Sequence, residues 1–507
     1  MKTITNYNKY NVLPIIKTIK YKAIDPALLY EGLAQMFEYS FILENIRFKE
    51  KIFSFIGIIP EKIIKFEKDK YDHFSLIIQA HTSSNQYLID QEPIEYLKKE
   101  LNYIKGPILP NIPDFYCSFV GYFGYEMIDF WEDIYHKNKG KKIKYGDLPL
   151  TTMILPKVSL IIDHSERLIH VVNCVYLTKD KNFQKELLEA NFEITQMEKN
   201  IKLLLDSFEK EKDSNFIFIN SSNYTSVENL IFHTKKNEFL DKVCKAKDYI
   251  NSGDAFQIVL SQKFSIELTS NSFEIYKALR IMNPSPYMFY INTPEVQIFG
   301  TSPEMLVKVE QNKVITRPLA GTKARNKNLE KDLQVEKELL NDEKEKAEHI
   351  MLVDLARNDL GRVCIEKSVK VTKLFGIEKY SHVMHIYSQV EGIKKETISS
   401  LDVLKRVFPA GTVSGAPKIR AIEIINELED EPREIYAGAI GYVDHNGNLD
   451  TSIAIRTIVC KKNKAIIQAG AGIVSYSDPE KEYYETLNKA KALFKAIGIT
   501  EEAFNNF

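Results

Sequence analysis

The chain has 507 residues, and its 68 lysines and arginines against 69 aspartates and glutamates give a formal net charge of −1 at pH 7. This balance argues against binding to nucleic acid or to anionic membranes, because proteins of those classes usually carry a basic excess. With 44% hydrophobic and 27% charged residues, the composition is typical of a globular protein and excludes disordered, collagen-like and low-complexity chains.

The five cysteines are widely spaced, odd in number and never in CxxC spacing, so we expect neither a disulfide scaffold nor a zinc site. Asn and Lys interrupt the apolar positions of residues 1–21, and no apolar run reaches the ~20 residues that a membrane span needs. We therefore expect no signal peptide, no membrane segment and a location in the reducing cytoplasm.

Residues 14–220 predict an α+β region. Apolar positions at helical spacing predict surface helices at 26–38 and 182–211. Short apolar or alternating runs predict strands at 52–57, 74–78 and 158–162.

The segment 208–226 mixes charges with Asn and Ser and predicts a linker. Helices are then expected at 227–255 and 479–498, and 444–448 predicts a hairpin turn. The strands expected in this second half cover 256–268, 286–300, 304–316, 438–443, 453–460 and 464–470, the last leading into a glycine-rich loop.

Two pairs of carboxylates stand at i,i+3 spacing, Glu345 with Glu348 and Glu482 with Glu485. On a helix this spacing places both side chains on one face, where Mg²⁺ could compensate their charge. The alternative for the first pair is a solvated Glu/Lys helix, and the pattern alone favours that alternative.

Two glycine-rich segments, 411–418 and 470–475, resemble nucleotide-binding loops but lack the spacing of the phosphate loop and of the dinucleotide fingerprint. Their backbone N–H groups suit carboxylates as well as phosphates.

Arg456 interrupts an otherwise apolar run, where a buried guanidinium needs an anionic partner. Taken alone, Thr301–Glu304 could be a helix cap, and His385 could be a core histidine.

A set of segments covers nearly all of residues 295–490. These segments are IFGTSPEML (298–306), RPLAGTKAR (317–325), EKAEHIMLVDLARNDLGRV (345–363), YSHVMHIYSQVEG (380–392), PAGTVSGAPKIRAIEII (409–425), YAGAIGYVD (436–444), LDTSIAIRT (449–457), QAGAGIVSYSDPEKEYYET (468–486) and NKA (488–490). In this order they resemble the chorismate-utilising enzymes, and most closely the large, chorismate-binding components of anthranilate synthases. The N-terminal half agrees more loosely, through ILEN (42–45), FSFIG (53–57) and VGYFGYE (120–126).

The resemblance implies an α/β (α+β) fold in which two antiparallel sheets pack face to face, flanked by helices. It implies an N-terminal region with an effector site at 1–207, a linker at 208–226 and a chorismate-binding catalytic domain at 227–507. The implied activity is a lyase reaction, the Mg²⁺-dependent conversion of chorismate and ammonia to anthranilate and pyruvate, the first step of tryptophan biosynthesis.

The resemblance also assigns roles to individual residues. Glu348 and Glu485 would bind Mg²⁺ at the ring carboxylate of chorismate, with Glu345 and Glu482 acting through water or through these ligands. The other carboxylate would be bound by side chains and backbone amides of Gly321, Thr322, Tyr436, Arg456, Gly470, Ala471 and Gly472.

Three residues are expected to carry the chemistry. Glu304 would protonate the departing C4 hydroxyl while ammonia adds at C2, and Thr412 would position the substrate. His385 would then remove the C2 proton, so that pyruvate leaves and the ring becomes aromatic.

Ala320 distinguishes between two activities of the family. Aminodeoxychorismate synthases usually carry a nucleophilic lysine at this position, and alanine cannot form a covalent adduct. We therefore expect free ammonia as the nucleophile, with aminodeoxychorismate synthase as the first alternative and a catalytically silent scaffold for an amidotransferase as the second.

Ammonia is mostly ammonium at neutral pH, and the chain has no cysteine in a nucleophile-elbow context such as GxCxG. The resemblance therefore implies a separate glutamine amidotransferase subunit. It also implies allosteric feedback by L-tryptophan. The expected effector residues are Glu44, Asn45, Pro286, Tyr287 and Met288, with Asn45 in place of the serine usual in the family, so binding should persist or be weakened.

Overall fold

The computed structural model describes residues 9–498 except 36, 49, 69–72, 81–82, 89–91, 110–111, 135–142, 178–181, 212–229 and 381–382. Its helices are α1 (Pro26–Leu33), α2 (Pro93–Tyr103), α3 (Ile128–Trp131), α4 (Phe183–Glu211), α5 (Lys236–Asn251), α6 (Ser272–Met282), α7 (Leu329–Asn341), α8 (Glu343–Val363), α9 (Ser400–Val407), α10 (Gly411–Ser414), α11 (Lys418–Leu428) and α12 (Pro479–Ala496). In the ranges described, no helix combines the length and the apolar character that crossing a membrane requires.

The strands alternate with these helices along the whole chain. They are β1 (Val12–Lys20), β2 (Ser40–Phe48), β3 (Lys51–Lys68), β4 (Phe74–Ala80), β5 (Ser83–Leu88), β6 (Ser118–Phe123), β7 (Thr151–Asp163), β8 (Leu168–Tyr176), β9 (Ile231–Phe232), β10 (Gln257–Glu267), β11 (Tyr287–Asn292), β12 (Gln297–Ser302), β13 (Met305–Glu310), β14 (Lys313–Thr316), β15 (Leu319–Ala324), β16 (Lys370–Lys379), β17 (Val383–Ile393), β18 (Gly415–Ala416), β19 (Ala439–Asp444), β20 (Leu449–Ile453), β21 (Thr457–Lys461) and β22 (Lys464–Ile473).

These strands form one antiparallel hydrogen-bonded network with two arms that start from the long pair β3–β7. One arm runs β7–β6–β19–β20–β13–β14–β17, and the other runs β3–β2–β11–β12–β21–β22–β10. Both arms cross from the N-terminal half into the C-terminal half, at β6–β19 and at β2–β11. The predicted linker is not tested, because 208–211 complete α4 and 212–226 lie outside the described residues.

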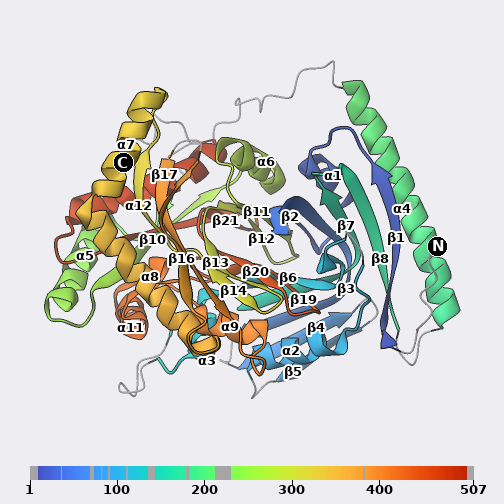
Figure 1. Ribbon diagram of the computed structural model, residues 1–507, viewed down its shortest axis with the longest axis horizontal. Helices are drawn as coiled ribbons and strands as arrows, with labels where there is room; N and C mark the ends of the chain where they lie inside the picture. The colour runs from blue at the N-terminus through green and yellow to red at the C-terminus, as the bar shows by residue number, and fades with distance from the viewer. Residues whose placement is uncertain are drawn as a thin grey trace.

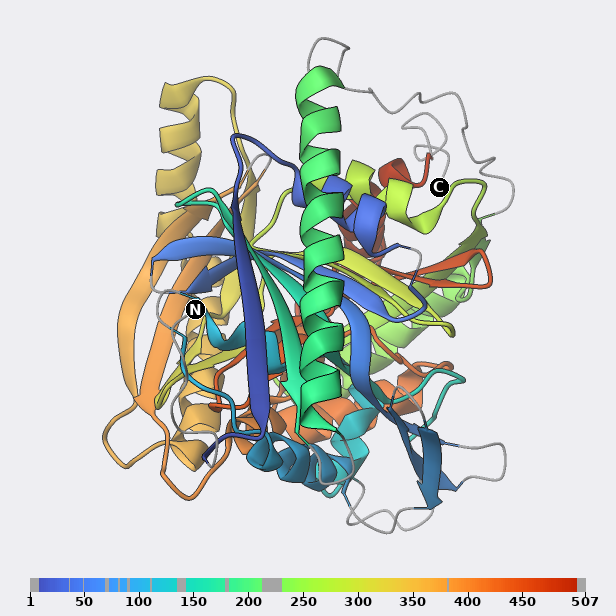
Figure 2. The same ribbon diagram turned by 90° about the vertical axis from the view of Figure 1, so that its right-hand side faces the viewer.

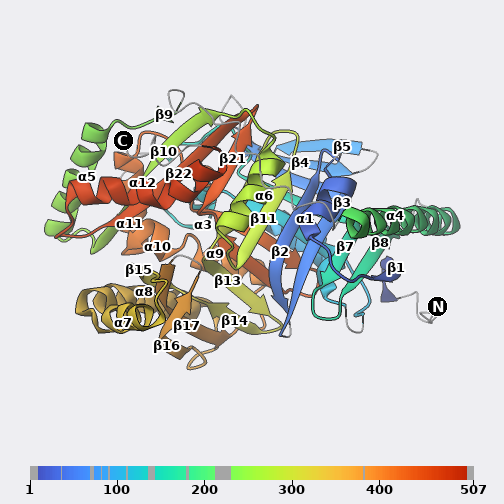
Figure 3. The same ribbon diagram turned by 90° about the horizontal axis from the view of Figure 1, so that it is seen from above.

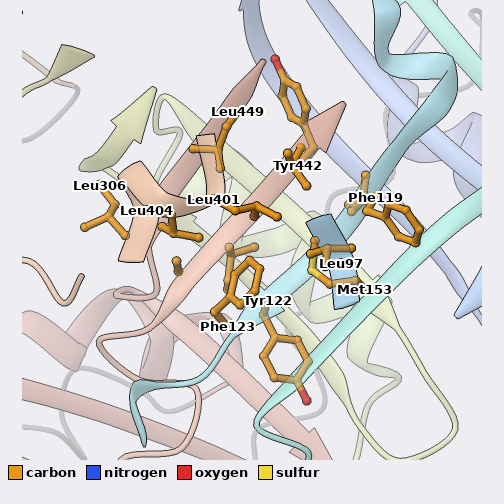
Figure 4. Packing of buried hydrophobic residues seen from close by; sticks show 14 of the residues in the cluster. Leu97, Phe119, Tyr122, Phe123, Met153, Leu306, Leu401, Leu404, Tyr442 and Leu449 are labelled. Atoms are coloured by element: carbon orange, nitrogen blue, oxygen red, sulfur yellow. The ribbon is translucent and has the colours of Figure 1, made fainter. Parts of the chain in front are cut away.

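The period-2 alternation of the strands divides the interior into two cores. Phe41 and Leu43 of β2 and Phe289 of β11 face the core between the two arms, together with Val307 of β13. Side chains from α2, β6, β7, β13, α9, β19 and β20 gather in this core (Figure 4). The strand neighbours of these residues, such as Ile42, face a second core under the outer helices. The two face-packed antiparallel layers are thus present, joined at β3 and β7.

The helices cover the outside of the sheet. The long helix α4 lies along β1 and β8 at one end of the molecule (Figures 1 and 2). At the opposite end, α7 and α8 pack against β15 and β17 (Figure 3). The helices α5, α6 and α12 cover the arm that contains β10, β12 and β22.

Most of the predicted elements are confirmed, and five details are wrong. The helix predicted at 26–38 ends at Leu33. The runs 286–300 and 304–316 each fold as a hairpin of two strands rather than one strand. The helix predicted from 227 begins only at Lys236, because Ile231–Phe232 pair with β10. The expected strand 453–460 is interrupted between β20 and β21, where Arg456 has a φ of 51°. Residues 470–473 continue β22 and pair with β10, so the glycine-rich loop is absent there.

Gly121 of β6 lies where β6 and β7 approach each other too closely for a side chain. A Cβ atom on Gly121 would lie 1.8 Å from the Thr152 carbonyl oxygen, which is backbone and cannot move aside. We expect Gly121→Ala to lower the free energy of unfolding by about 3 kcal/mol or more, measured by urea denaturation.

Gly361, on the exposed side of α8, is the matched control, because a Cβ atom added there would meet no atom of the described residues within 4 Å. Gly361→Ala should raise the free energy of unfolding by about 0.5–1 kcal/mol, through the higher helix propensity of alanine. Equal stabilities of the two variants would contradict the packing of β6 on β7.

Candidate functional site

Glu304 lies in the short connection between β12 and β13, and only 6% of its surface is exposed. The Leu319 N–H donates to its Oε1 at 3.5 Å, and the Thr412 hydroxyl faces the carboxyl without a hydrogen bond of regular geometry. Burial raises the pKa of Glu304 to about 8, although Thr412 and Leu319 act in the opposite direction. The carboxyl therefore keeps its proton at neutral pH, as a general acid requires. Thr301–Glu304 caps no helix.

His385 of β17 lies opposite Thr322 of β15, and the two side chains meet at 2.9 Å between Nδ1 and Oγ1. Gly321 forms a bulge beside them with a φ of 71°, a conformation that favours glycine. Burial, and then the charge of Arg456, lowers the pKa of His385 to about 4. The imidazole is therefore neutral at physiological pH and can accept a proton.

Arg456 supplies a cation that lacks an anionic partner. Its guanidinium donates to the Lys489 carbonyl, and it forms no ion pair with any carboxylate that the structure describes. Burial lowers the pKa of Arg456, whereas Tyr436 raises it. A half-buried cation without a counter-charge is stabilised by a bound anion.

The wall beside this cation is built from Tyr436 and from β22. A Cβ atom on Gly470 would lie 2.7 Å from the Tyr436 hydroxyl and 2.9 Å from the Leu260 carbonyl, so glycine is required by close approach. The strand β21 pairs with β22 only up to Ile467. Beyond that point, one edge of β22 at Gly470–Gly472 has no partner among the described strands. Its backbone N–H and C=O groups on that edge are therefore not used in strand pairing.

The four predicted carboxylates come from two helices, Glu345 and Glu348 from α8 and Glu482 and Glu485 from α12. Tyr476 lies in the segment that leads into α12, and its hydroxyl donates to Glu348 Oε1 of α8 at 2.5 Å. Burial and Glu348, and then the charges of Glu345 and Glu482, raise the pKa of Tyr476. Burial and the neighbouring carboxylate raise the pKa of Glu345, and burial and Glu485 do the same for Glu482.

These carboxylates fit Mg²⁺ by their chemistry, because Mg²⁺ prefers oxygen ligands and is usually bound by one or two carboxylates together with water and an anionic ligand. In the parts of the chain that are described, no group of three or more His, Cys, Asp or Glu side chains is arranged to hold a metal ion without such a ligand. Mutual repulsion within each pair is the observation that favours a compensating cation.

Lys489 was not predicted as a site residue. Its Nζ donates to Glu485 at 2.7 Å and to the Gly470 carbonyl at 2.9 Å, and its charge lowers the pKa values of Glu304 and His385. The sequence signal was its position four residues after Glu485, which places both side chains on one face of α12. Lys489 thus contacts Glu485 and β22 and acts through its charge on Glu304 and His385.

The five predicted effector residues line one cavity of about 210 Å³, whose lining includes neither Glu304 nor His385. Glu44 of β2 and Met288 of β11 are cross-strand partners, which explains why two distant motifs meet. Glu44 is 4% exposed and accepts hydrogen bonds from Arg280 and Tyr276 at 2.6 Å each. The cavity residues among those predicted are Glu44, Asn45, Pro286, Tyr287 and Met288.

Asn45 occupies a bulge of β2 with a φ of 63°, and its Nδ2 donates to the Ser285 carbonyl at 2.9 Å. This hydrogen bond fixes the side chain against the segment that carries Pro286. Tyr287 donates from its hydroxyl to Asp450 Oδ1 at 2.9 Å, so Asp450 adds an acidic group to the cavity that the sequence did not indicate.

Comparison with known proteins agrees with this arrangement. A family model described as chorismate binding enzyme matches residues 26–495. Anthranilate synthase component 1 of Acetivibrio thermocellus is 42% identical over 493 residues, 96% of each chain. The protein of the same name from Aquifex aeolicus (strain VF5) is 40% identical over 497 residues, 97% of this chain and 96% of the relative.

A solved structure supports the same assignment. The crystal structure of anthranilate synthase component I from Streptococcus pneumoniae TIGR4 matches with a TM-score of 0.73 at 34% identity, covering 94% of this chain and 99% of that one. The resemblance inferred from the motifs is therefore confirmed. The chain belongs to the chorismate-binding enzyme family, and within it to the anthranilate synthase component 1 proteins.

Proposed function

We propose that this chain is the chorismate-converting component of an anthranilate synthase, which turns chorismate and ammonia into anthranilate, pyruvate and water. The observation that carries the proposal is that the pKa values of two groups are shifted in opposite directions. The pKa of Glu304 is raised to about 8, so the carboxyl is protonated at neutral pH, and the pKa of His385 is lowered to about 4, so the imidazole is neutral there. An acid and a base separated in this way can both act at neutral pH.

In this proposal, different residues of the chain bind chorismate and transfer protons. Arg456 and Tyr436 bind one carboxylate of chorismate beside the open edge of β22. Ammonia adds at C2 while the C4 hydroxyl leaves as water, taking the proton of Glu304. The added ammonia loses one proton, which restores the acid form of Glu304. His385 then removes the proton from C2 while the C3–O bond breaks and the ring becomes aromatic, and the departing enolpyruvate takes up one proton to become pyruvate.

We further propose that Glu348 and Glu485 hold Mg²⁺, with Glu345 and Glu482 supporting them. The ion would supply positive charge to the second carboxylate of chorismate and fix the orientation of the ring. Tyr476 supports this arrangement, because it ties Glu348 of α8 to the segment that leads into α12.

His385→Ala is expected to slow pyruvate release by about 10²–10⁴-fold, the usual contribution of a general base. Formation of the aminodeoxyisochorismate intermediate should suffer less, because that step uses Glu304. Rapid quenching followed by mass spectrometry measures both steps. His233→Ala is the control, since His233 contacts Glu431 and Ser265 rather than the site. Equal losses in both steps would contradict the assignment of the base.

The overall activity is tested by incubating the purified chain with chorismate, Mg²⁺ and an ammonium salt. Anthranilate and equimolar pyruvate are expected. A product that keeps the enolpyruvyl group would indicate an aminodeoxychorismate synthase, and no turnover would indicate a silent scaffold. Ala320 argues against the first alternative, and the tuned acid and base argue against the second.

The proposal includes a separate glutamine amidotransferase subunit as the source of ammonia. The chain alone should therefore use ammonium salts but not glutamine, and adding the subunit should confer activity with glutamine. Activity of the chain alone with glutamine would refute this part.

The proposal also includes a cytoplasmic location, which the five free cysteines support.

We propose that the cavity around Glu44 binds L-tryptophan and that binding inhibits the reaction. Asn45 is larger than serine and is held by the Ser285 carbonyl, so inhibition should require more tryptophan than in an Asn45→Ser variant. Titrating activity with tryptophan measures the shift, and Asn446→Ser in an exposed turn is the control. No inhibition of either the wild type or Asn45→Ser at millimolar tryptophan would show that the effector site is lost.

A further inference from the structure

Arg433 is a buried arginine outside the predicted site, with 3% of its surface exposed. Its Nε and Nη2 donate to the two oxygens of Glu429 at 2.8 and 2.7 Å. Its Nη1 donates to the Val413 carbonyl and its Nη2 also to the Val259 carbonyl, each at 2.7 Å. The planar guanidinium is therefore fixed from three directions at once.

Glu429 completes the arrangement from the end of α11. Besides Arg433, it accepts hydrogen bonds from the Ser261 N–H and the Ser261 hydroxyl, both at 2.8 Å. On this edge, β10 pairs with β18 at Gln257 and Ile258 and with β9 further along, and no described strand covers the gap between them. The Arg433–Glu429 pair fills this gap and satisfies the backbone that a strand would otherwise bind.

The β10 residues bound in this way, Val259 and Ser261, support the wall that Tyr436 and β22 form beside Arg456. In the pairing of β10 with β22, Val259 lies opposite Gly472 and Ser261 lies opposite Gly470. Gln468 of β22 also donates to the Ser261 hydroxyl at 2.8 Å. The pair thus fixes the two residues of β10 that face the two glycines.

The same guanidinium reaches two more parts of the site. Its Cζ lies 5.5 Å from the centre of the Tyr436 ring, and the backbone N–H of Tyr436 donates to the Arg433 carbonyl at 3.1 Å. Val413, whose carbonyl it binds, directly follows Thr412 at the Glu304 carboxyl. One buried cation therefore contacts Tyr436, the support of β22 and the segment of Thr412.

We propose that Arg433, locked by Glu429, is a positioning residue for chorismate: it holds Tyr436, the β10 support of Gly470–Gly472 and the Thr412 segment in register with one another. This inference rests on the proposed function, because it assumes that this wall binds a carboxylate of chorismate. Charge alone does not suffice, since the three donors of a lysine ammonium cannot satisfy the four oxygens that the planar guanidinium of Arg433 binds.

The test compares Arg433→Met, Arg433→Lys and Glu429→Gln with the wild type. Chorismate affinity is measured by calorimetry with Mg²⁺ and without ammonium, so that binding is observed without turnover. We expect Arg433→Met and Arg433→Lys to weaken chorismate binding by about 10- to 100-fold, the cost of a small misplacement of binding groups. In the ammonium assay, KM for chorismate should rise while KM for ammonia stays unchanged.

Lys65→Met is the matched control, because Lys65 is a buried cation of β3 that contacts Glu295 and Tyr39 rather than residues of this wall. It should lower the melting temperature without changing chorismate affinity. If Arg433→Met does not fold, Glu429→Gln serves as the test variant instead. It keeps the shape of the Glu429 side chain and removes the negative charge that fixes the Arg433 guanidinium.

Wild-type affinity in Arg433→Lys and Glu429→Gln would overturn the inference, as would an equal loss of affinity in Lys65→Met. These outcomes are separate from a failure of the proposed function. A wild-type chain that binds chorismate but makes a product other than anthranilate would refute the function, and the binding comparison would still decide the role of Arg433.

Discussion

Glu304→Gln is expected to lower kcat for anthranilate formation by about 10²–10⁴-fold, the usual contribution of a positioned general acid. Glutamine keeps the shape and the Leu319 hydrogen bond but has no proton to give to the leaving C4 hydroxyl. The loss should appear in the disappearance of chorismate as well as in product, because this step precedes pyruvate release.

The pH profile gives an independent readout of the same group. Since the acid acts in its protonated form, kcat/KM should be flat through neutral pH and fall as pH rises through about 8, the pKa to which burial raises Glu304. The rates must be compared at constant free ammonia, because raising the pH also converts ammonium to ammonia. On the acidic side, His385 should limit activity only near its pKa of about 4. Glu304→Gln should remove the alkaline limb.

Asp444→Asn provides the control for this variant. Asp444 is also a buried carboxyl, and burial raises its pKa to about 7, but it ends β19 before the turn into β20 and accepts a hydrogen bond from Asn448. The control should keep both the rate and the alkaline limb. If Glu304→Gln kept its rate while Asp444→Asn lost it, Glu304 would not be the acid.

Motifs in the sequence predicted candidate residues for the site but not the geometry that brings them together. Glu304, His385 and Arg456 could be named from motifs, but nothing local indicates that a carboxyl is buried deeply enough to retain its proton. That property arises because the short connection between β12 and β13 packs against α10, which lies far from it in the chain. The pairing of Thr322 with His385 is likewise a matter of sheet register.

The misassigned segments have physical explanations too. Glycines at 470 and 472 suggested a loop, yet they lie in a paired strand, where Tyr436 and Gln257 leave no space for a side chain. The run 286–300 contained its turn signal, the Thr293–Pro294 step, inside an otherwise apolar stretch. Arg433 was missed because two of its partners come from β10 and α10, far away in the sequence, and because its spacing of four residues from Glu429 lies outside a helix.

The removal of one carboxylate from the proposed Mg²⁺ site is the second variant with a large expected effect. Glu485→Gln should lower activity by about 10²-fold or more, since even residues that only support metal ligands contribute 10- to 100-fold. Glutamine is neutral and a weaker ligand, and its loss of charge also releases Lys489, which is bonded to Glu485 at 2.7 Å. Activity of chelator-treated protein, measured against added Mg²⁺, should therefore saturate at a higher concentration or not at all.

Glu480→Gln is the matched control, because Glu480 lies one turn earlier on α12 and pairs with Lys236 at 2.7 Å, away from α8. It should keep the wild-type rate and Mg²⁺ dependence. Glu348→Gln should reproduce the loss from the other helix, since Mg²⁺ bound between α8 and α12 needs a carboxylate from each. Full activity of Glu485→Gln at low Mg²⁺, or wild-type activity that survives the chelator, would mean that this pair of helices holds no catalytic metal.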